Sequence, residues 1–292
     1  MRKNHGFITA SVSFAERRVI SMKYQLAAFD MDGTLLTSDK RILPETLEAI
    51  READKAGKYI ALCTGRPLCE LAPYKEYLQY IRFAILESGG ILYDFKESRV
   101  IRRHCLPAEA IPEILKIITL EDIMPQAMIG GKSYIRTCDL DRMDHYFMGV
   151  YHSLYAEVAI CTDGWKDLVL SKAREIDKIN LYHVDRATSI RTHDRLEGLS
   201  IERTYAETSS LELSPSGVNK GTALLDLTEY LHIPVEETIA VGDADNDIPS
   251  IKAAGLGVAM ANANANVREI ADVITRDNDH DGCGEVIRKY ML

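Results

Sequence analysis

Short runs of apolar residues without alternation recur in the first part of the chain, and each run ends in a turn-forming or polar residue. The runs cover residues 26–29, 58–63 and 81–86. Continuous apolar runs of this length predict strands that are buried on both faces of a parallel sheet. A stretch with helical spacing begins at Pro44, between the first two runs. We therefore expect alternating strands and helices in a doubly wound α/β arrangement.

The pattern changes between about residues 91 and 210. Residues 133–137 and 181–185 alternate apolar and polar positions, and residues 111–120 have helical character. Such a mixture predicts an inserted α/β domain whose sheet is more exposed on one face than on the other.

The first pattern returns at about residue 211. Apolar runs at 238–241 and 256–260 predict two more buried strands, after a helix that begins near Lys220. The chain therefore returns to its first sheet after the insertion.

These changes of pattern set the expected domain boundaries. One domain comprises residues 23–87 and 211–292, and the inserted domain comprises residues 88–210. Residues 1–22 lack the continuous apolar segment and the cleavage site of a signal peptide. We expect them to be a disordered extension or the product of an upstream start codon, with a weakly amphipathic contact segment as the alternative.

Two acidic residues follow the first predicted strand. Asp30 and Asp32 are two residues apart, so in extended geometry their side chains point to the same side, and Gly33 then allows a sharp turn. Two carboxylates held together are costly unless a metal ion or a proton lies between them. Open α/β sheets bind ligands at the carboxyl ends of their strands, which is where these acids lie.

Overall charge and cysteine content narrow the class of partner. The net charge is −9, with 35 Lys and Arg against 44 Asp and Glu, which argues against a nucleic-acid partner and favours small molecules. No apolar run approaches the roughly 20 residues that span a bilayer, so we expect no membrane association. The six cysteines contain no CxxC pair. We expect reduced thiols in a cytoplasmic protein.

Four motifs occur in the same order as in the haloacid dehalogenase superfamily of phosphohydrolases, and the chain resembles its Cof-like branch from about residue 23 to the end. The motifs are Asp30-Met31-Asp32-Gly33-Thr34-Leu35, Thr64-Gly65-Arg66, Val218-Asn219-Lys220-Gly221 and Gly242-Asp243-Ala244-Asp245-Asn246-Asp247-Ile248. The resemblance implies a Rossmann-like doubly wound parallel sheet core with an inserted C2-type α/β cap domain.

The resemblance also implies roles for the acidic residues. Asp30 would attack phosphorus to give an aspartyl-phosphate, and Asp32 would protonate the leaving oxygen and later deprotonate water. Mg²⁺ would bind the Asp30 and Asp243 carboxylates and the Asp32 backbone carbonyl. Asn246 and Asp247 complete the metal motif, as direct ligands or by orienting metal-bound water or Lys220.

The phosphate-binding residues follow from the same resemblance. Gly33, Thr64, Gly65, Lys220 and Asn262 would hold phosphoryl oxygens or offset their charge. A further residue of the second motif, Arg66, would either reach the substrate or pair with an acid.

Two segments depart from the family pattern. Ser88-Gly89-Gly90 stands where the family has Asn-Gly-Ala, so the contact of that Asn side chain is not expected here. Met260-Ala261-Asn262-Ala263 replaces Met-Gly-Asn-Ala, which is a milder change. Neither departure touches the nucleophile, the acid or the metal ligands.

The expected function is a Mg²⁺-dependent phosphatase acting on a small phosphorylated metabolite such as a sugar phosphate. The alternatives are a phosphomutase with the same aspartyl-phosphate, and a non-catalytic binding or regulatory protein on the same fold. The sequence names neither the substrate nor the oligomeric state.

Overall fold

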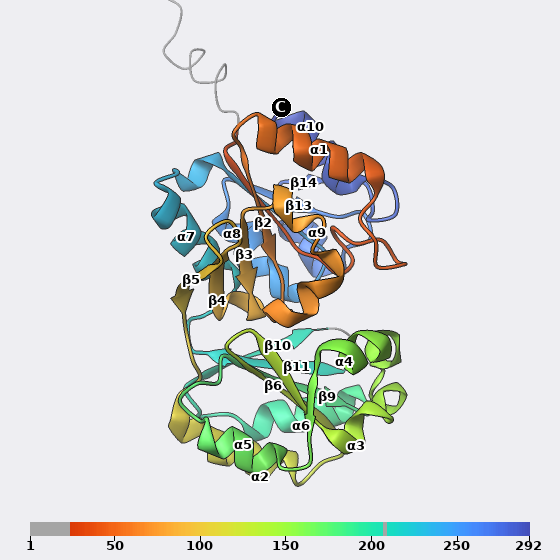
Figure 1. The fold of residues 1–292 in the computed structure, drawn as a ribbon, viewed down its shortest axis with the longest axis vertical. Helices are drawn as coiled ribbons and strands as arrows, with labels where there is room; N and C mark the ends of the chain where they lie inside the picture. The colour runs from red at the N-terminus through yellow and green to blue at the C-terminus, as the bar shows by residue number, and fades with distance from the viewer. Residues whose placement is uncertain (1–23, 207–208) are drawn as a thin grey trace, which may run out of the picture.

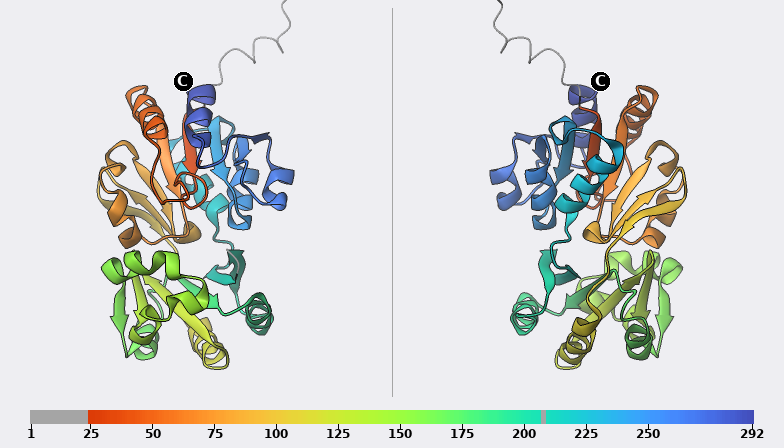
Figure 2. Two further views of the ribbon diagram at one scale, coloured as in Figure 1. Left: turned by 90° about the vertical axis from the view of Figure 1, so that its right-hand side faces the viewer. Right: turned by 90° about the vertical axis from the view of Figure 1, so that its left-hand side faces the viewer.

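The computed structural model describes residues 24–206 and 209–292, and it contains two β-sheets that lie one above the other (Figure 1). The extension expected at residues 1–22 lies outside the described residues. Both views of Figure 2 show the same two parts, joined by two chain connections. No helix in the described part of the chain is long and apolar enough to cross a membrane.

The larger sheet has eight strands and forms the Rossmann-like core. In order across the sheet they are β14 (Val273–Ile274), β13 (Leu256–Ala259), β12 (Thr238–Gly242), β1 (Leu26–Phe29), β2 (Tyr59–Cys63), β3 (Phe83–Leu86), β4 (Ile91–Asp94) and β5 (Arg99–Arg103). The six strands from β14 to β3 are parallel, and β4 and β5 add an antiparallel edge. The strands expected from apolar runs are thus confirmed, with ends that shift by two residues or fewer.

Helices on this sheet pack in two groups. Helix α1 (Pro44–Lys55) contacts α10 (Gly282–Tyr290), and α7 (Lys220–Leu231) contacts α8 (Ile248–Ala253), which in turn contacts α9 (Ala265–Ile270). The residues of β1 are all buried, as expected for a central strand with both faces covered.

The parallel register brings three strand ends to one edge. Phe29 of β1 lies beside Leu62 of β2 and Val241 of β12. Because these strands run in the same direction, the residues after each of them emerge together at that edge. The edge faces the second sheet (Figure 1).

The second sheet has six strands, and helices cover the face that points away from the core. The strand order is β10 (Ile201–Ala206), β11 (Ser210–Pro215), β9 (Lys178–His183), β6 (Ile123–Ile129), β7 (Lys132–Arg136) and β8 (Ile160–Thr162). Figure 1 shows α2 (Ile111–Ile118), α5 (Trp165–Ser171) and α6 (Arg186–Arg195) on the far side of this sheet. Two further helices, α3 (Thr137–Leu140) and α4 (His152–Val158), lie at its side (Figure 1).

Along the central strands of the second sheet, β6, β9 and β11, successive side chains lie alternately in two environments. One set of side chains packs in an apolar cluster with the helices: Ile123, Ala127, Ile129, Ile179, Leu181, Leu211 and Leu213. The alternate set, which includes Gln126, Asn180 and Glu212, points toward the core. The expectation of an exposed face was wrong for β6, β9 and β11, which are buried throughout. The polar face exists, but the core covers it.

The boundaries between the sheets differ from those expected at residues 88 and 210. Strands β4 and β5 extend the core sheet as far as Arg103, and β11 belongs to the second sheet as far as Pro215. The exposed residues of the edge strand β5 resemble those of a half-exposed insert, which explains the difference at the first boundary. We propose that the cap comprises residues 104–215 and the core comprises the remaining described residues.

Candidate active site

Lys220 lies at the centre of the strand-end cluster. It is the first residue of α7, whose start is fixed by reciprocal hydrogen bonds between Asn219 and Thr222. Its Nζ donates to Asp30 Oδ1 and to Asp247 Oδ1, each at 2.6 Å. A buried lysine is stable only with such partners, so the cluster holds it in one position.

Burial and the charge of the partner shift the pKa values of Asp30 and Lys220 in opposite directions. Burial raises the pKa of Asp30 well above its usual range, although the charge of Lys220 lowers it. Burial lowers the pKa of Lys220, but the charges of Asp247 and Asp30 outweigh burial and raise it. Lys220 therefore stays protonated, and it offsets the charge of the acids on either side of it.

Asp243 is held against the turn that follows β1. The hydroxyl of Thr34 donates to Asp243 Oδ1 at 2.8 Å. Gly33 has a φ of +80°, and a Cβ at this position would lie 2.5 Å from Asp243 Oδ2. Only glycine therefore allows both the turn and the close approach of this carboxylate. Burial and the charge of Asp247 raise the pKa of Asp243 to about 6.

Asp247 uses both of its carboxylate oxygens within the cluster. Its Oδ1 accepts from Lys220, and its Oδ2 accepts from the backbone N–H groups of Asp243 and Ala244 at 2.9 and 3.1 Å. A Cβ on Gly242 would lie 2.3 Å from the carboxyl carbon of Asp247, so glycine is required beside it. Asp247 thereby orients Lys220 and the turn that carries Asp243.

The acids of this cluster fit a divalent cation. Asp30, Asp243 and Asp247 each offer a carboxylate oxygen, and these oxygens all lie within 4.8 Å of one another. Burial is the largest cause of the raised pKa values of Asp30 and Asp243, and the charges of neighbouring acids add to it. Oxygen ligands suit Mg²⁺, and a cation would relieve that repulsion. Asn246 lines the cavity beside them.

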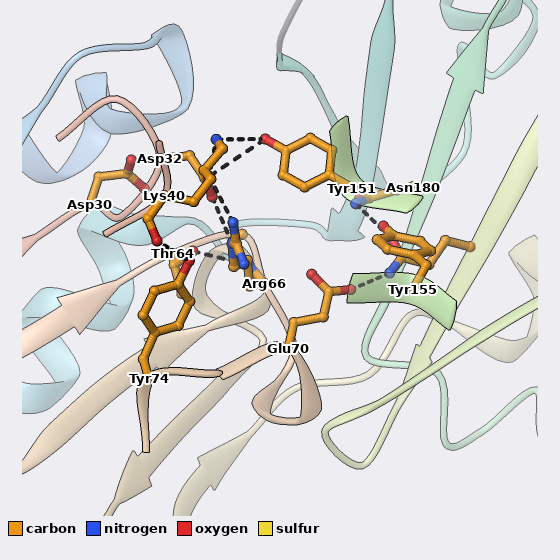
Figure 3. A network of polar contacts seen from close by, with 12 residues as sticks. Asp30, Asp32, Lys40, Thr64, Arg66, Glu70, Tyr74, Tyr151, Tyr155 and Asn180 are labelled. Carbon is orange, nitrogen blue, oxygen red and sulfur yellow. Dashed lines mark hydrogen bonds and ion pairs between the residues drawn. The ribbon is translucent and has the colours of Figure 1, made fainter. Parts of the chain in front are cut away.

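Asp32 is bound by two cations. Arg66 donates from Nε to Oδ2 and from Nη2 to Oδ1, each at 2.7 Å, and Lys40 Nζ donates to Oδ1 at 2.6 Å (Figure 3). Burial opposes ionisation of Asp32, but Arg66 and Lys40 lower its pKa to about 2. In this structure Arg66 therefore pairs with an acid, which was one of the two roles open to it.

A tyrosine of the cap reaches this group of charges. The Tyr151 hydroxyl accepts from Lys40 at 3.3 Å and lies 3.5 Å from Asp32 Oδ1 (Figure 3). Its ring lies 5.0 Å from Lys40 Nζ and 5.6 Å from the Arg66 guanidinium carbon, within the range of cation–π contacts. The cap therefore contacts Asp32 and the two cations that bind it.

The second motif forms the turn after β2. Thr64 is buried, lines the cavity with Gly65, and accepts a hydrogen bond from the Arg66 N–H at 3.2 Å. Asn262 is exposed, and its amide donates to the Gly33 carbonyl at 2.8 Å. The structure thus places Asn262 against the turn that follows Asp32.

A buried ion pair of the cap lies behind the Thr64-Gly65 turn. Lys178 Nζ lies 2.8 Å from Glu212 Oε1 and donates to the Gly65 carbonyl at 3.2 Å. Ser88, where the family pattern has Asn, donates to Glu212 Oε2 at 2.6 Å and accepts from Lys178 at 2.9 Å. Burial raises the pKa of Glu212, but Lys178 and Ser88 outweigh it, so the pKa is lowered.

A cavity of about 240 Å³ lies between the core and the cap. The core contributes Asp30, Asp32, Thr64, Gly65, Arg66, Glu70, Asp243, Ala244 and Asn246, and the cap contributes Gln126, Met128, Met148, Tyr151, Tyr155, Asn180, Tyr182, Ala206, Ser210 and Glu212. Sequence reasoning assigned no role to the cap residues. Polar residues inside apolar runs, as in Ile-Met-Pro-Gln-Ala-Met-Ile at residues 123–129, were the available signal.

Comparisons with known proteins agree with this geometry. The family model described as haloacid dehalogenase-like hydrolase matches residues 27–287. The 5-amino-6-(5-phospho-D-ribitylamino)uracil phosphatase YcsE of Bacillus subtilis is 30% identical over 268 residues, which are 92% of this chain and 96% of that protein. The pyridoxal phosphate phosphatase YbhA of Escherichia coli is 27% identical over 289 residues, 93% of this chain and 100% of that protein.

A solved structure supports the same relationship. A haloacid dehalogenase-like hydrolase from Bacillus subtilis superposes with a TM-score of 0.80 at 27% identity, and the match covers 91% of this chain and 99% of that one.

Proposed function

The chain belongs to the haloacid dehalogenase-like hydrolase family, and we propose that it is a Mg²⁺-dependent phosphatase acting on a small phosphorylated metabolite. One observation carries this proposal. The buried Lys220 joins Asp30 and Asp247 beside Asp243, at the strand edge that opens into the cavity between core and cap. Such a cluster suits the neutralisation of a phosphate dianion during its transfer.

Asp30 is the proposed nucleophile. Lys220 holds its Oδ1 at 2.6 Å and fixes the carboxylate at the edge of the cavity. A carboxylate oxygen of Asp30 attacks phosphorus, the bond from phosphorus to the ester oxygen breaks, and an aspartyl-phosphate forms. Water then attacks this phosphoryl group, which restores the carboxylate and releases inorganic phosphate.

Asp32 is the proposed proton carrier. It lies two residues beyond Asp30 and lines the same cavity. It protonates the leaving oxygen in the first step and accepts a proton from water in the second. A phosphate dianion in the cavity competes with Asp32 for Arg66. Loss of this partner raises the pKa of Asp32, so its carboxylate takes up a proton from water before it donates that proton to the leaving oxygen.

The metal site is proposed to use the Asp30 and Asp243 carboxylates and the Asp32 backbone carbonyl, with Asn246 at its edge. When bound, Mg²⁺ supplies charge neutralisation for the phosphoryl oxygens. Asp247 keeps Lys220 and the Asp243 turn in place, because its oxygens bind Lys220 and two backbone N–H groups. Thr64 and Gly65 hold phosphoryl oxygens from the other side of the cavity, and the Gly33 turn is held by Asn262.

The relatives support a phosphate monoester as the substrate. One is named for 5-amino-6-(5-phospho-D-ribitylamino)uracil and another for pyridoxal phosphate, both small monoesters. The cavity between core and cap gives such a substrate a site that closure of the cap shields from water. All six cysteines are free, which supports a reducing, cytoplasmic location.

Phosphate release from p-nitrophenyl phosphate in Mg²⁺ tests the proposed activity. We expect turnover by the unaltered protein and loss of at least a thousandfold in Asp30→Asn. An Asp30→Asn variant with most of its activity would contradict the mechanism. Isomerisation of sugar phosphates without release of inorganic phosphate would instead identify a phosphomutase.

A further inference from the structure

Three polar residues form a row across the central strands of the cap sheet. Gln126 of β6 pairs in register with Asn180 of β9, and Asn180 pairs with Glu212 of β11. All three side chains line the cavity on the face that points toward the core. The row therefore lies over the reaction centre as a strip of amide and carboxylate groups.

Hydrogen bonds fix the first residue of this row. Gln126 Nε2 donates to Glu70 Oε1 and to Ser133 Oγ, each at 2.8 Å. Gln126 Oε1 accepts from Asn180 Nδ2 at 3.1 Å and from the Tyr182 hydroxyl at 2.8 Å. Figure 3 shows Glu70 between Arg66 and the group that contains Asn180 and Tyr155.

One polar atom of this network is left over. Asn180 is 6% exposed, and its Oδ1 has no hydrogen-bond partner among the described residues. A buried carbonyl oxygen without a hydrogen-bond donor carries a free-energy cost. A ligand that donates a hydrogen bond in the cavity would remove this cost by pairing with Asn180 or by rearranging the network.

The cavity offers little to a second anionic group. Arg66 is the only lysine or arginine among the described residues that line it, and its Nε and Nη2 donate to Asp32. Lys178, behind the lining, is paired with Glu212. Glu70 and Glu212, two further carboxylates, themselves line the cavity.

The remaining lining suits an uncharged organic group. Tyr155, Tyr182, Met128 and Met148 also line the cavity. Aromatic and thioether side chains pack against rings and carbon chains, while the polar row supplies acceptors.

We propose that Gln126, Asn180 and Glu212, together with Glu70, form the leaving-group subsite, which selects monophosphate esters of uncharged groups rich in hydrogen-bond donors and rejects esters with a second anion. This inference rests on the proposed phosphatase function. It separates hydroxylated or ring N–H leaving groups from carboxylates and second phosphates.

Two substrates that differ at a single carbon test the inference. Sorbitol 6-phosphate ends in an alcohol where 6-phosphogluconate ends in a carboxylate. We expect kcat/KM to be at least tenfold higher for sorbitol 6-phosphate. Equal values, or a preference for 6-phosphogluconate, would overturn the inference.

Two variants test whether the polar row and Glu70 are responsible for the selection between esters. Asn180→Leu should lower kcat/KM for sorbitol 6-phosphate at least tenfold more than for p-nitrophenyl phosphate. At pH 8.5, above the pKa of about 7 at which Glu70 ionises, Glu70→Gln should reduce the discrimination against 6-phosphogluconate at least threefold. Glu76→Gln, at an exposed position nearby, should not alter it. The inference would be overturned if Asn180→Leu left the ratio of kcat/KM for sorbitol 6-phosphate to that for p-nitrophenyl phosphate unchanged, and Glu70→Gln left the ratio for sorbitol 6-phosphate to 6-phosphogluconate unchanged.

Binding separates failure of the subsite from failure of the activity. Calorimetry with Asp30→Asn measures the affinity for both esters without turnover. If Asp30→Asn binds sorbitol 6-phosphate selectively but the unaltered protein releases no phosphate from it, the subsite is retained and the phosphatase function is rejected. Phosphate release without selectivity would reject the subsite alone.

Discussion

Arg66 binds both carboxylate oxygens of Asp32, with Nε 2.7 Å from Oδ2 and Nη2 2.7 Å from Oδ1. The pair joins the residue expected to carry protons to the turn that follows β2. It holds Asp32 as an ionised carboxylate before a substrate arrives.

Removal of Arg66 should raise the pKa of Asp32. Its pKa is about 2 in this structure because Arg66 and Lys40 outweigh burial. Without the bidentate partner, Arg66→Met should raise it by at least one unit. Titration of the Asp32 carboxyl by carbon NMR in Mg²⁺-free buffer measures the shift. Arg41→Met, which removes an exposed arginine, is the matched control, and an Asp32 pKa that Arg66→Met leaves near 2 would contradict this account.

Removal of Lys220 should destabilise the fold. Lys220→Met leaves Asp30 and Asp247 buried without their shared cation. The expected loss is about 3–5 kcal/mol in the free energy of unfolding, measured by urea denaturation in EDTA. Lys132→Met, at an exposed strand position, should change it by less than about 0.5 kcal/mol. Equal stability of the two variants would show that Lys220 is not the cation that holds the cluster.

Metal binding should require glycine at position 33 because a Cβ there would displace Asp243, and not only because of the positive φ. Gly33→Ala places a Cβ 2.5 Å from Asp243 Oδ2, whereas Gly198, with a similar φ of +87°, has open space around that position. Both alanine variants should lose about 1 kcal/mol of stability from backbone strain. Only Gly33→Ala should also lose Mg²⁺ affinity, by at least tenfold in a calorimetric titration. Similar Mg²⁺ affinity in both variants would remove Gly33 from the metal site.

Glu70 should make stability fall as the pH rises. Burial, the largest cause, raises its pKa to about 7. The carboxyl is therefore protonated in the folded state at pH values where the unfolded chain has already ionised. Its stabilising contribution is complete below the ordinary pKa near 4.5 and is lost as the pH rises to about 7.

Glu70→Gln should remove this pH dependence. Relative to the unaltered protein, the variant should gain about 2–3 kcal/mol of unfolding free energy between pH 4.5 and pH 8. Urea denaturation at several pH values measures the difference, which also cancels the titration of Asp30 and Asp243. A difference that does not change with pH would mean that Glu70 ionises normally.

Much of the core could be predicted from the sequence because local signals and fold agree there. Buried parallel strands appear as continuous apolar runs, and the polar residues after them meet at one edge in any doubly wound sheet. Asp30, Lys220 and Asp243 therefore follow from their positions at the ends of elements. Thr34 lies within the first motif, but its position in the sequence does not indicate its hydrogen bond to Asp243.

The cap could not be predicted to the same depth. Its alternating strands indicate a polar face, but the pattern is the same whether water or another domain covers that face. The row of Gln126, Asn180 and Glu212 depends on strand register, which brings together residues from three separate segments. The pairing of Arg66 with Asp32 likewise depends on how two turns approach each other.

In the proposed mechanism Asp30 carries the phosphoryl group, and Asp32 carries protons to the leaving oxygen and from the attacking water. The most direct measurement is acid-quenched covalent phosphate on the protein after mixing with ³²P-labelled acetyl phosphate in Mg²⁺, with the labelled residue identified by mass spectrometry. Asp32→Asn should accumulate label on Asp30 because hydrolysis of the intermediate is slowed, and Asp30→Asn should carry none. Label on another residue, or equal labelling of Asp30→Asn, would contradict the account.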